Sequence, residues 1–218
     1  MRHSIEEYAT IVFDCDGVVL NSNKVKTQAF YHAALPYGEM AAQELVNYHV
    51  TNGGISRYKK FAYFLDKIVA DQTGPDLETL LEAYVSQVRQ GLLSCEVAPG
   101  LENLRAHTSN ARWLIVSGGD QTELKDILVQ RGLGDLFDGG IFGSPDTKDE
   151  ILNREVGNGN IQSPALFLGD SKYDYLASTA AGLDFVFVRG WSEFMNWRDF
   201  FKNKDTFYIE FISQLTAF

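Results

Sequence analysis

Short apolar runs that end in Asp or Gly recur along the chain, and they constrain its fold more than any other sequence feature. They do not alternate with polar residues and are rich in β-branched and aromatic side chains; they cover residues 10–14, 112–117, 165–170 and 185–189. Such runs are typical of strands buried on both faces of a parallel sheet. Helical patterns lie between them, so we predict an α/β fold with a doubly wound parallel sheet.

The clearest helical pattern follows the second run. Asp120 is a suitable N-cap, with Glu123 as its reciprocal capping partner, and Gly132 is a suitable end of the helix. The apolar face consists of Leu124, Ile127 and Leu128. We therefore expect a helix directly after the strand that ends near residue 117.

The stretch from residue 21 to 96 contains no strand-like run and reads as several helices. Examples cover residues 24–35, 56–70 and 76–92, with Gly53-Gly54 and Gly74-Pro75 as breakers. The α/β pattern returns at Ala98-Pro99-Gly100. We predict a catalytic core formed by residues 1–20 and 97–218, with residues 21–96 as an inserted helical cap domain.

The charge balance limits the kind of partner. The chain has 218 residues, of which 45% are hydrophobic, and its 19 basic and 29 acidic residues give a net charge of −10. A nucleic acid or an anionic membrane surface would repel such a chain, so neither is expected as a partner. A small ligand bound by a few local charges remains compatible with this composition.

The two cysteines, Cys15 and Cys95, cannot form a disulfide framework. The first ten residues lack the apolar run of a signal peptide, and no apolar stretch approaches the ~20 residues of a transmembrane helix. We therefore expect a reduced, cytoplasmic protein, either a monomer or a homodimer.

Carboxylates follow two of the apolar runs. Asp14 and Asp16 follow the first run, and Asp170 and Asp174 follow the third. Ligands of open parallel sheets bind at the carboxyl ends of strands. An all-oxygen set without His or Cys suits a hard cation such as Mg²⁺, which would relieve the repulsion among these groups. A divalent cation beside a carboxylate nucleophile points to phosphoryl transfer.

Four motifs in this order resemble those of the haloacid dehalogenase superfamily of phosphohydrolases. They are Asp14-Cys-Asp16-Gly-Val-Val, Ser117-Gly-Gly, Lys148 and Gly169-Asp170-Ser-Lys-Tyr-Asp174. The resemblance spans nearly the whole chain and is strongest to the capped phosphoglycolate phosphatase and β-phosphoglucomutase-like subgroup. It implies a Rossmann-like core, a helical cap and a phosphoric monoester hydrolase.

The resemblance implies two catalytic carboxylates. Asp14 would attack phosphorus and form an aspartyl phosphate. Asp16 would protonate the leaving oxygen and then activate the hydrolytic water.

The resemblance also implies how phosphate and metal are held. Ser117, the Gly118 N–H and Lys148 would bind the phosphoryl group. Mg²⁺ would contact the carboxylates of Asp14 and Asp170 and the backbone carbonyl of Asp16. Asp174 would lie in contact with the metal or one shell out.

Simpler roles exist for the same residues. Asp14 and Asp16 are suitable for capping a turn, Ser117 for a strand-to-helix turn, and Lys148 for a charge in a first helical turn. Asp174 is equally suited to capping the helix that begins near Tyr175. Cys15 reads as a buried filler, and the four histidines match no metal-ligand spacing.

The glycine-rich segment in the cap resembles the cap loop of β-phosphoglucomutase and related phosphatases. Gly54, Ser56 and Arg57 would face the active site, and Arg57 would grip a distal phosphate, carboxylate or sugar hydroxyl. The alternative for Arg57 is an ordinary solvated helix charge.

Two departures from the mutase pattern favour simple hydrolysis. Asn21 and Lys26 stand where such mutases have an Asp and a His, and Gly118-Gly119-Asp120 replaces their Ser-Lys-Asn. A sugar-phosphate mutase therefore remains the alternative function. Dehalogenase chemistry is disfavoured because Asp16, Asp170 and Asp174 are all present.

The C-terminal stretch is rich in aromatic residues. Trp191, Phe194, Trp197 and Phe201 have helical spacing, which predicts a helix packed on the sheet. A partner-binding surface or a dimer interface is the other interpretation of a stretch that ends at Phe218, and it leaves open a non-catalytic binding protein on the same fold.

We predict a Mg²⁺-dependent phosphatase that hydrolyses a small phosphorylated metabolite. The local cations would make the site receptive to phosphate despite the overall negative charge. Sugar phosphates, phosphoglycolate and nucleoside monophosphates all fit this expectation.

Overall fold

A six-stranded parallel sheet forms the centre of the molecule, whose computed structural model describes residues 3–216. The strand order is β3-β2-β1-β4-β5-β6. The strands are β1 (Thr10–Phe13), β2 (Arg112–Asp120), β3 (Gly140–Ser144), β4 (Ala165–Gly169), β5 (Asp184–Val188) and β6 (Phe207–Ile209). This confirms the predicted doubly wound α/β fold.

Both faces of the sheet are buried, which explains why its strands are apolar without alternation. In β1, Ile11 and Phe13 belong to one hydrophobic cluster and Val12 belongs to another. The register pairs Phe13 with Ile115 of β2 and with Leu168 of β4. The residues that follow these three strands therefore meet at one edge of the sheet.

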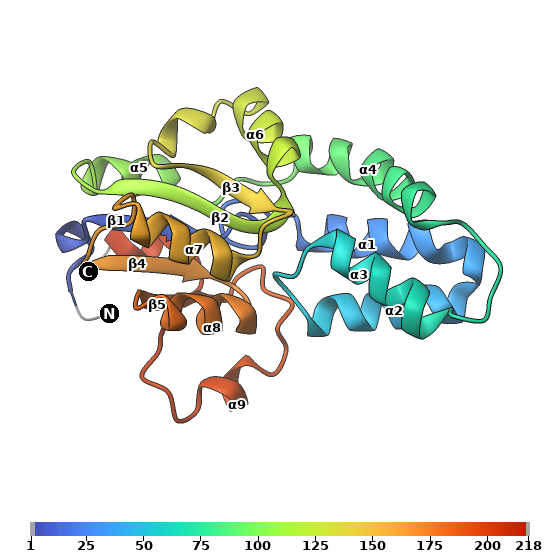
Figure 1. Cartoon of the computed structure of the whole chain (residues 1–218). Coiled ribbons are helices and arrows are strands. Elements are labelled where there is room, and N and C mark those ends of the chain that lie inside the picture. The colour runs from blue at the N-terminus through green and yellow to red at the C-terminus, as the bar shows by residue number, and fades with distance from the viewer. Residues whose placement is uncertain (1–2, 217–218) are drawn as a thin grey trace.

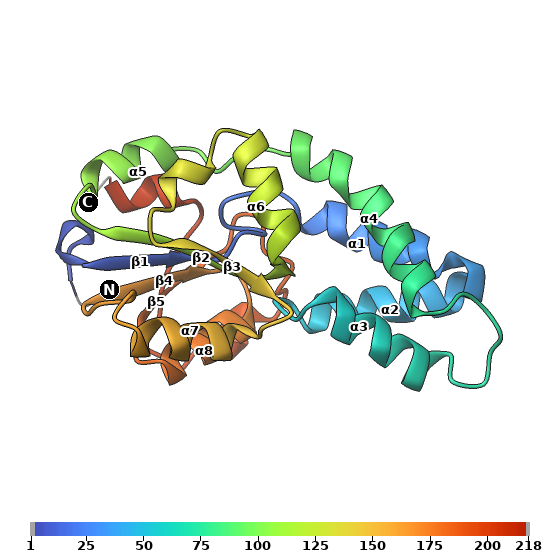
Figure 2. The same ribbon diagram turned by 45° about the horizontal axis from the view of Figure 1, so that its top comes forward.

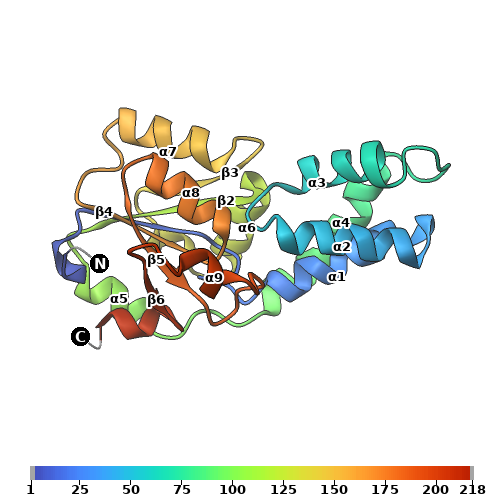
Figure 3. The same cartoon turned by 90° about the horizontal axis from the view of Figure 1, so that it is seen from below.

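Helices cover both faces of the sheet (Figure 1). On one face lie α5 (Leu101–His107), α6 (Gln121–Gln130) and the short helix Ile212–Thr216, and on the other lie α7 (Lys148–Gly157) and α8 (Lys172–Ala180). The view from below shows α7 and α8 beside each other on their face (Figure 3).

Four helices inserted between β1 and α5 lie together beyond the carboxyl ends of the strands (Figure 2). They are α1 (Asn23–Ala34), α2 (Glu39–Thr51), α3 (Arg57–Tyr63) and α4 (Leu77–Ser94), with a π-helical turn at Phe64–Ile68. We call this group the inserted helices. α1 packs on α2 and α4, and its buried Phe30 contacts the rings of Phe61 and Tyr84.

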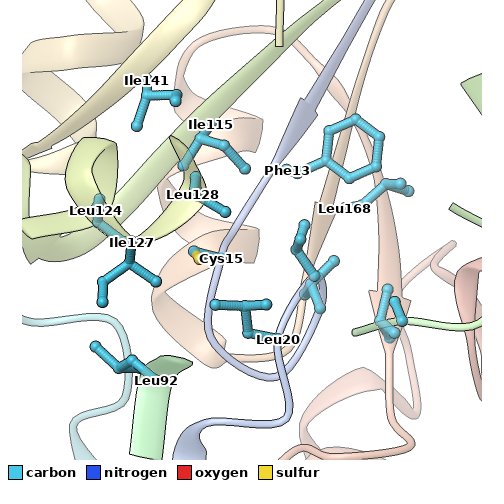
Figure 4. Packing of buried hydrophobic residues seen from close by; sticks show 14 of the residues in the cluster. Phe13, Cys15, Leu20, Leu92, Ile115, Leu124, Ile127, Leu128, Ile141 and Leu168 are labelled. Atoms are coloured by element: carbon cyan, nitrogen blue, oxygen red, sulfur yellow. The ribbon is translucent and has the colours of Figure 1, made fainter. Parts of the chain in front are cut away.

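One hydrophobic cluster continues from the sheet into the inserted helices (Figure 4). Cys15 is fully buried in this cluster, near Leu20, and Leu92 of α4 and Ile127 of α6 belong to the same group. Burial raises the pKa of the Cys15 thiol well above its usual value. The thiol is therefore a packing group, as the sequence suggested.

The C-terminal aromatic stretch differs from the prediction. Between residues 191 and 201 only α9 (Trp197–Phe201) is helical, and residues 191–196 form turns and loop. The stretch packs on β5, where Phe187 contacts the rings of Phe194, Trp197 and Phe201. The expected helix over 191–201 is wrong in extent because ring packing, and not helical periodicity, spaces these residues; Phe218 lies outside the described residues.

Within residues 3–216, no helix combines the length and the apolar character that crossing a membrane requires.

Candidate active site

A cavity of about 360 Å³ lies between the carboxyl ends of the strands and the inserted helices. The sheet contributes Asp14, which follows β1, and Asp170, which follows β4. The inserted helices contribute Phe30, His49 and Lys60 to the opposite wall. This volume lies in the range of small-molecule sites.

Asp14 is held at the floor of the cavity by backbone and side-chain contacts. Its N–H donates to the Leu168 carbonyl of β4 (2.9 Å), and its Oδ1 accepts from the Cys15 N–H (2.7 Å). Oδ2 lies 3.0 Å from Nζ of Lys148. Burial raises the pKa of Asp14 to about 7 although Lys148 opposes the shift. The carboxylate is thus buried, oriented and facing a cation.

Lys148 is the first residue of α7 and is fully buried between two carboxylates. Its Nζ forms ion pairs with Asp14 and with Asp174. Burial alone would lower the pKa of Lys148, but these two carboxylates outweigh it and raise the pKa. Lys148 is thus a charge in the first turn of α7, as one interpretation had it, and its ammonium group lies beside Asp14.

Asp14, Asp170 and Asp174 form a buried carboxylate cluster. One oxygen from each lies within 4.8 Å of the others, and no second set of metal-ligating groups of this kind occurs in residues 3–216. Burial, followed by the charges of Asp14 and Asp174, raises the pKa of Asp170 well above its usual value. An all-oxygen set that repels itself fits a hard divalent cation.

The members of the carboxylate cluster are oriented by their neighbours. Asn23 of α1 donates its side-chain amide to Oδ2 of Asp170 (2.7 Å). Asp174 accepts from Lys148 through Oδ1, and through Oδ2 from the Ser171 and Asp170 N–H groups (3.0 and 3.2 Å). The predicted cap of a helix beginning near Tyr175 is wrong, because α8 begins at Lys172 with Ser171 as its N-cap and Asp174 as the reciprocal partner in the first turn. Asp174 also lies in the carboxylate cluster.

The backbone beside Asp170 leaves no room for a side chain at position 17. Gly17 has φ +77, and a Cβ added there would lie 2.1 Å from Oδ2 of Asp170. The glycine after Asp16 therefore allows the first loop to approach the carboxylate cluster closely.

The carboxylate of Asp16 points away from that cluster. It accepts from Nζ of Lys26 (2.5 Å) and from the Ser22 hydroxyl (2.5 Å). Burial alone would raise the pKa of Asp16, but Lys26 outweighs it and lowers the pKa. Asp16 is therefore ionised here, on the side of the site that faces the inserted helices.

The predicted phosphate-binding loop lies at the end of β2. Ser117 is fully buried and accepts the Gly119 N–H at its Oγ (3.1 Å). Gly118 lines the cavity, and a Cβ there would lie 2.1 Å from the Gly54 carbonyl oxygen. Only glycine at position 118 permits this contact between the β2 loop and the inserted helices.

The three predicted cap residues have different surroundings. Gly54 lines the cavity, whereas Ser56 is the N-cap residue of α3 and lines a smaller adjoining pocket of about 160 Å³. Arg57 lines the cavity, but its guanidinium donates to Glu123 of α6 (2.7 Å). It is therefore neither a solvated helix charge nor a free cation.

The capping prediction for α6 is half right. Asp120 accepts the Glu123 N–H (2.9 Å) as expected. The Glu123 side chain does not return to the cap, because it binds Arg57 instead. Tyr58 adds a second contact from α3, since its hydroxyl donates to Asp120 (2.8 Å).

The motifs of the sequence did not reveal Lys60 and His49 as cavity residues, nor the contact of Lys26 with Asp16. A signal was present, because each lysine lies in the buried face of an amphipathic helix. Lys26 precedes Ala29, Phe30 and Ala33 at helical spacing, and Lys60 precedes Phe61 and Phe64. A lysine in such a position is buried with its helix face.

The chain is similar to known proteins in sequence and in fold. A family model described as haloacid dehalogenase-like hydrolase matches residues 11–188. No curated protein sequence is significantly similar to the chain.

Three solved structures illustrate the similarity. A predicted phosphoglycolate phosphatase from Haemophilus somnus has a TM-score of 0.73 at 18% identity, with 96% of this chain and 97% of that chain covered. A predicted phosphatase from Clostridium acetobutylicum has a TM-score of 0.72 at 17% identity, with 96% and 97% covered. CbbY from Rhodobacter sphaeroides, solved with phosphate, has a TM-score of 0.69 at 18% identity, with 95% and 96% covered.

Proposed function

Because this chain belongs to the haloacid dehalogenase-like hydrolase family, we propose that it is a Mg²⁺-dependent phosphatase acting on small phosphorylated metabolites. One observation carries the proposal: the buried Asp14 carboxylate lies on a ligand-sized cavity, paired with Lys148 and beside Asp170 and Asp174. The names of the structural neighbours, which include phosphatases and a protein solved with phosphate, support the same chemistry.

Asp14 is the proposed nucleophile. Its oxygen attacks phosphorus, the ester oxygen leaves, and an aspartyl phosphate remains, so one difficult displacement becomes two easier ones. Lys148, 3.0 Å from Asp14, stabilises the negative charge of the transferring group. Ser117 and the Gly118 N–H are the proposed ligands of the phosphoryl oxygens.

Asp16 is the proposed acid and base. It protonates the leaving oxygen in the first step and takes a proton from the attacking water in the second. The ion pair with Lys26 favours the ionised form, which the second step requires. The first step requires that Asp16 gain a proton, so it must loosen this contact as the substrate binds.

The metal site is proposed at the carboxylate cluster. Mg²⁺ would be held by Asp14, Asp170 and the backbone carbonyl of Asp16. Asp174 already accepts hydrogen bonds from the Asp170 and Ser171 N–H groups, so it would position the loop that carries Asp170. The cation would supply Lewis-acid stabilisation of the phosphoryl oxygens.

The inserted helices, within residues 21–96, are proposed to form a cap over the cavity. The close approach of Gly54 to Gly118 and the hydrogen bond of Arg57 to Glu123 hold the cap against the core, an arrangement that would limit the access of water to the cavity. A sugar-phosphate mutase is disfavoured by Lys26, which binds Asp16 where such mutases have a His.

Phosphate release from para-nitrophenyl phosphate tests the proposal. We expect turnover with Mg²⁺, loss of turnover with EDTA and restoration by added Mg²⁺. Asp14→Asn should retain less than about one-thousandth of the activity, as for loss of other enzymic nucleophiles. Turnover that survives in metal-free Asp14→Asn protein would refute both the nucleophile and the metal.

A further inference from the structure

A buried lysine on the cap side faces the same cavity as the carboxylate cluster. Lys60 of α3 is 2% exposed and lines the cavity together with His49, Phe30 and Tyr84. Its Nζ lies 2.7 Å from Nδ1 of His49 and 5.6 Å from the centre of the Phe30 ring. The lysine head group is thus surrounded by a ring nitrogen and an aromatic face.

Lys60 differs from the other two buried cations that the inserted helices contribute to the cavity. Lys26 lies 2.5 Å from Asp16, and Arg57 lies 2.7 Å from Glu123. No Asp or Glu oxygen within residues 3–216 lies within 4.0 Å of Lys60 Nζ. A buried ammonium without an anionic partner is strongly destabilised.

The charges around Lys60 do not replace such a partner. Burial is the largest effect and lowers its pKa to about 7; Lys26 and Lys148 act in the same direction, and Asp16 and Glu193 oppose them. Burial, Lys60 and Lys26 together lower the pKa of His49 well below its usual value. His49 is therefore neutral, and its Nδ1 accepts from Lys60 when it carries no proton.

We propose that Lys60, oriented by His49, binds a second anionic group of the substrate, a carboxylate or a further phosphate. The inference rests on the proposed phosphatase function and defines its substrate class as phosphomonoesters with a second negative charge. The phosphoryl group that is transferred occupies the Asp14 end, and the second anion occupies the cap end.

The chemistry of the cap wall supports this class of substrate. The lysine ammonium is a compact positive charge that binds either a carboxylate or a phosphate without requiring a fixed geometry. Of the three buried cap cations, Lys26 and Arg57 already have carboxylate partners, so Lys60 gains the most from an anion. A bound anion would also keep Lys60 protonated, so binding would take up a proton.

Matched substrate pairs test the proposal. We would compare kcat/KM for 3-phosphoglycerate and glycerol 3-phosphate, which differ in one carboxylate. A second pair, fructose 1,6-bisphosphate and fructose 6-phosphate, differs in one phosphate. We expect wild-type protein to prefer the doubly anionic member of at least one pair by about 10-fold or more, the value of one charged hydrogen bond.

Lys60→Met retains the aliphatic stem and removes the charge. We expect it to lose the preference, through a fall of about 10- to 100-fold in kcat/KM for the doubly anionic substrate. Lys67→Met, which changes an exposed lysine just beyond α3, is the matched control and should keep the preference. A merely structural role for Lys60 would lower the melting temperature instead, without changing the ratio within a pair.

The outcomes separate this inference from the proposed function. An unchanged ratio in Lys60→Met, or the absence of a preference in both pairs for an active wild-type enzyme, overturns the inference alone. If no ester is hydrolysed, the proposed function fails. Calorimetric titration of the Asp14→Asn protein with 3-phosphoglycerate, with and without Lys60→Met, then still decides whether Lys60 binds the anion.

Discussion

The two walls of the cavity, one formed at the carboxyl ends of the strands and one by the inserted helices, have opposite charge imbalances. On the sheet side, three carboxylates are buried together, two of them are paired with Lys148, and the pKa values of Asp14 and Asp170 are raised. On the cap side, Lys60 has no carboxylate partner, and its pKa is lowered. The sheet wall lacks positive charge and the cap wall lacks negative charge. A cation at one wall and an anionic substrate at the other would relieve both.

The two walls also differ in how their parts are joined. Backbone geometry builds the sheet wall, because Asp14 and Asp170 follow neighbouring strands in fixed register. Side chains join the cap to the core, through Arg57 with Glu123 and Tyr58 with Asp120. The sheet wall is therefore held by backbone hydrogen bonds between strands, whereas these side-chain contacts hold the inserted helices against it.

The largest expected effect follows from removing Lys148, the only cation within residues 3–216 that is paired with Asp14. Lys148→Met should lower kcat/KM for para-nitrophenyl phosphate by about 10²- to 10³-fold, the cost of removing one stabilising donor from an active site. It should also raise the pKa of Asp14 further, because the favourable charge is gone.

Steady-state kinetics with Lys125→Met as control measure this effect. Lys125 is exposed on α6, so its loss should change kcat/KM by less than about 2-fold. If kcat/KM of Lys148→Met lies within about 3-fold of the wild-type value, Lys148 does not take part in catalysis.

The link between the walls should have an intermediate effect. In a double-mutant cycle, Arg57→Met and Glu123→Gln should be coupled by about 1–3 kcal/mol in urea unfolding, because both side chains are only 9% exposed.

Kinetics on the same variants distinguish two roles of Arg57. If it only fastens the cap, both substitutions should change KM alike. If Arg57 leaves Glu123 to grip the substrate, Arg57→Met should raise KM and Glu123→Gln should not. A coupling energy near zero between Arg57 and Glu123 would show that this ion pair does not hold the inserted helices to the core.

The smallest expected effect is on stability. The pKa of Lys60 is lowered on folding, so the folded state binds fewer protons than the unfolded state between about pH 7 and the usual lysine value. The resulting penalty is complete below about pH 7 and fades as the pH rises towards 10.

Lys60→Met removes this penalty. Its melting temperature should exceed that of wild type by about 3 °C at pH 6, which corresponds to about 1 kcal/mol for a chain of this size. The gain should shrink steadily towards pH 10. A melting temperature that falls equally at every pH would contradict the unpaired charge on the cap wall.

The sheet and its site were predictable because both depend on short stretches of sequence. An apolar run fixes a buried strand, and Asp14 and Asp170 come directly after two such runs. Neighbouring parallel strands then bring them together without any further information. The resemblance to a known family supplied Lys148, whose approach to Asp14 the local sequence does not reveal.

The remaining features depend on contacts between distant parts of the chain. Glu123 binds Arg57, 66 positions away in sequence, and so leaves the capping role that its local pattern favoured. The aromatic spacing near Trp197 suggested a longer helix because ring packing on β5 produces similar intervals. The position of Lys60 in an apolar helix face predicts that this lysine is buried. It does not predict that the lysine has no carboxylate partner, because that depends on distant parts of the chain.

Direct trapping of the covalent intermediate tests the central claim, that Asp14 attacks phosphorus. Protein mixed with a phosphomonoester substrate and Mg²⁺ is quenched and treated with borohydride, which reduces an aspartyl phosphate to homoserine, and its peptides are read by mass spectrometry. The account predicts homoserine at position 14, absent when substrate or Mg²⁺ is omitted. Steady turnover with unmodified Asp14, or with the modification at another carboxylate, would contradict it.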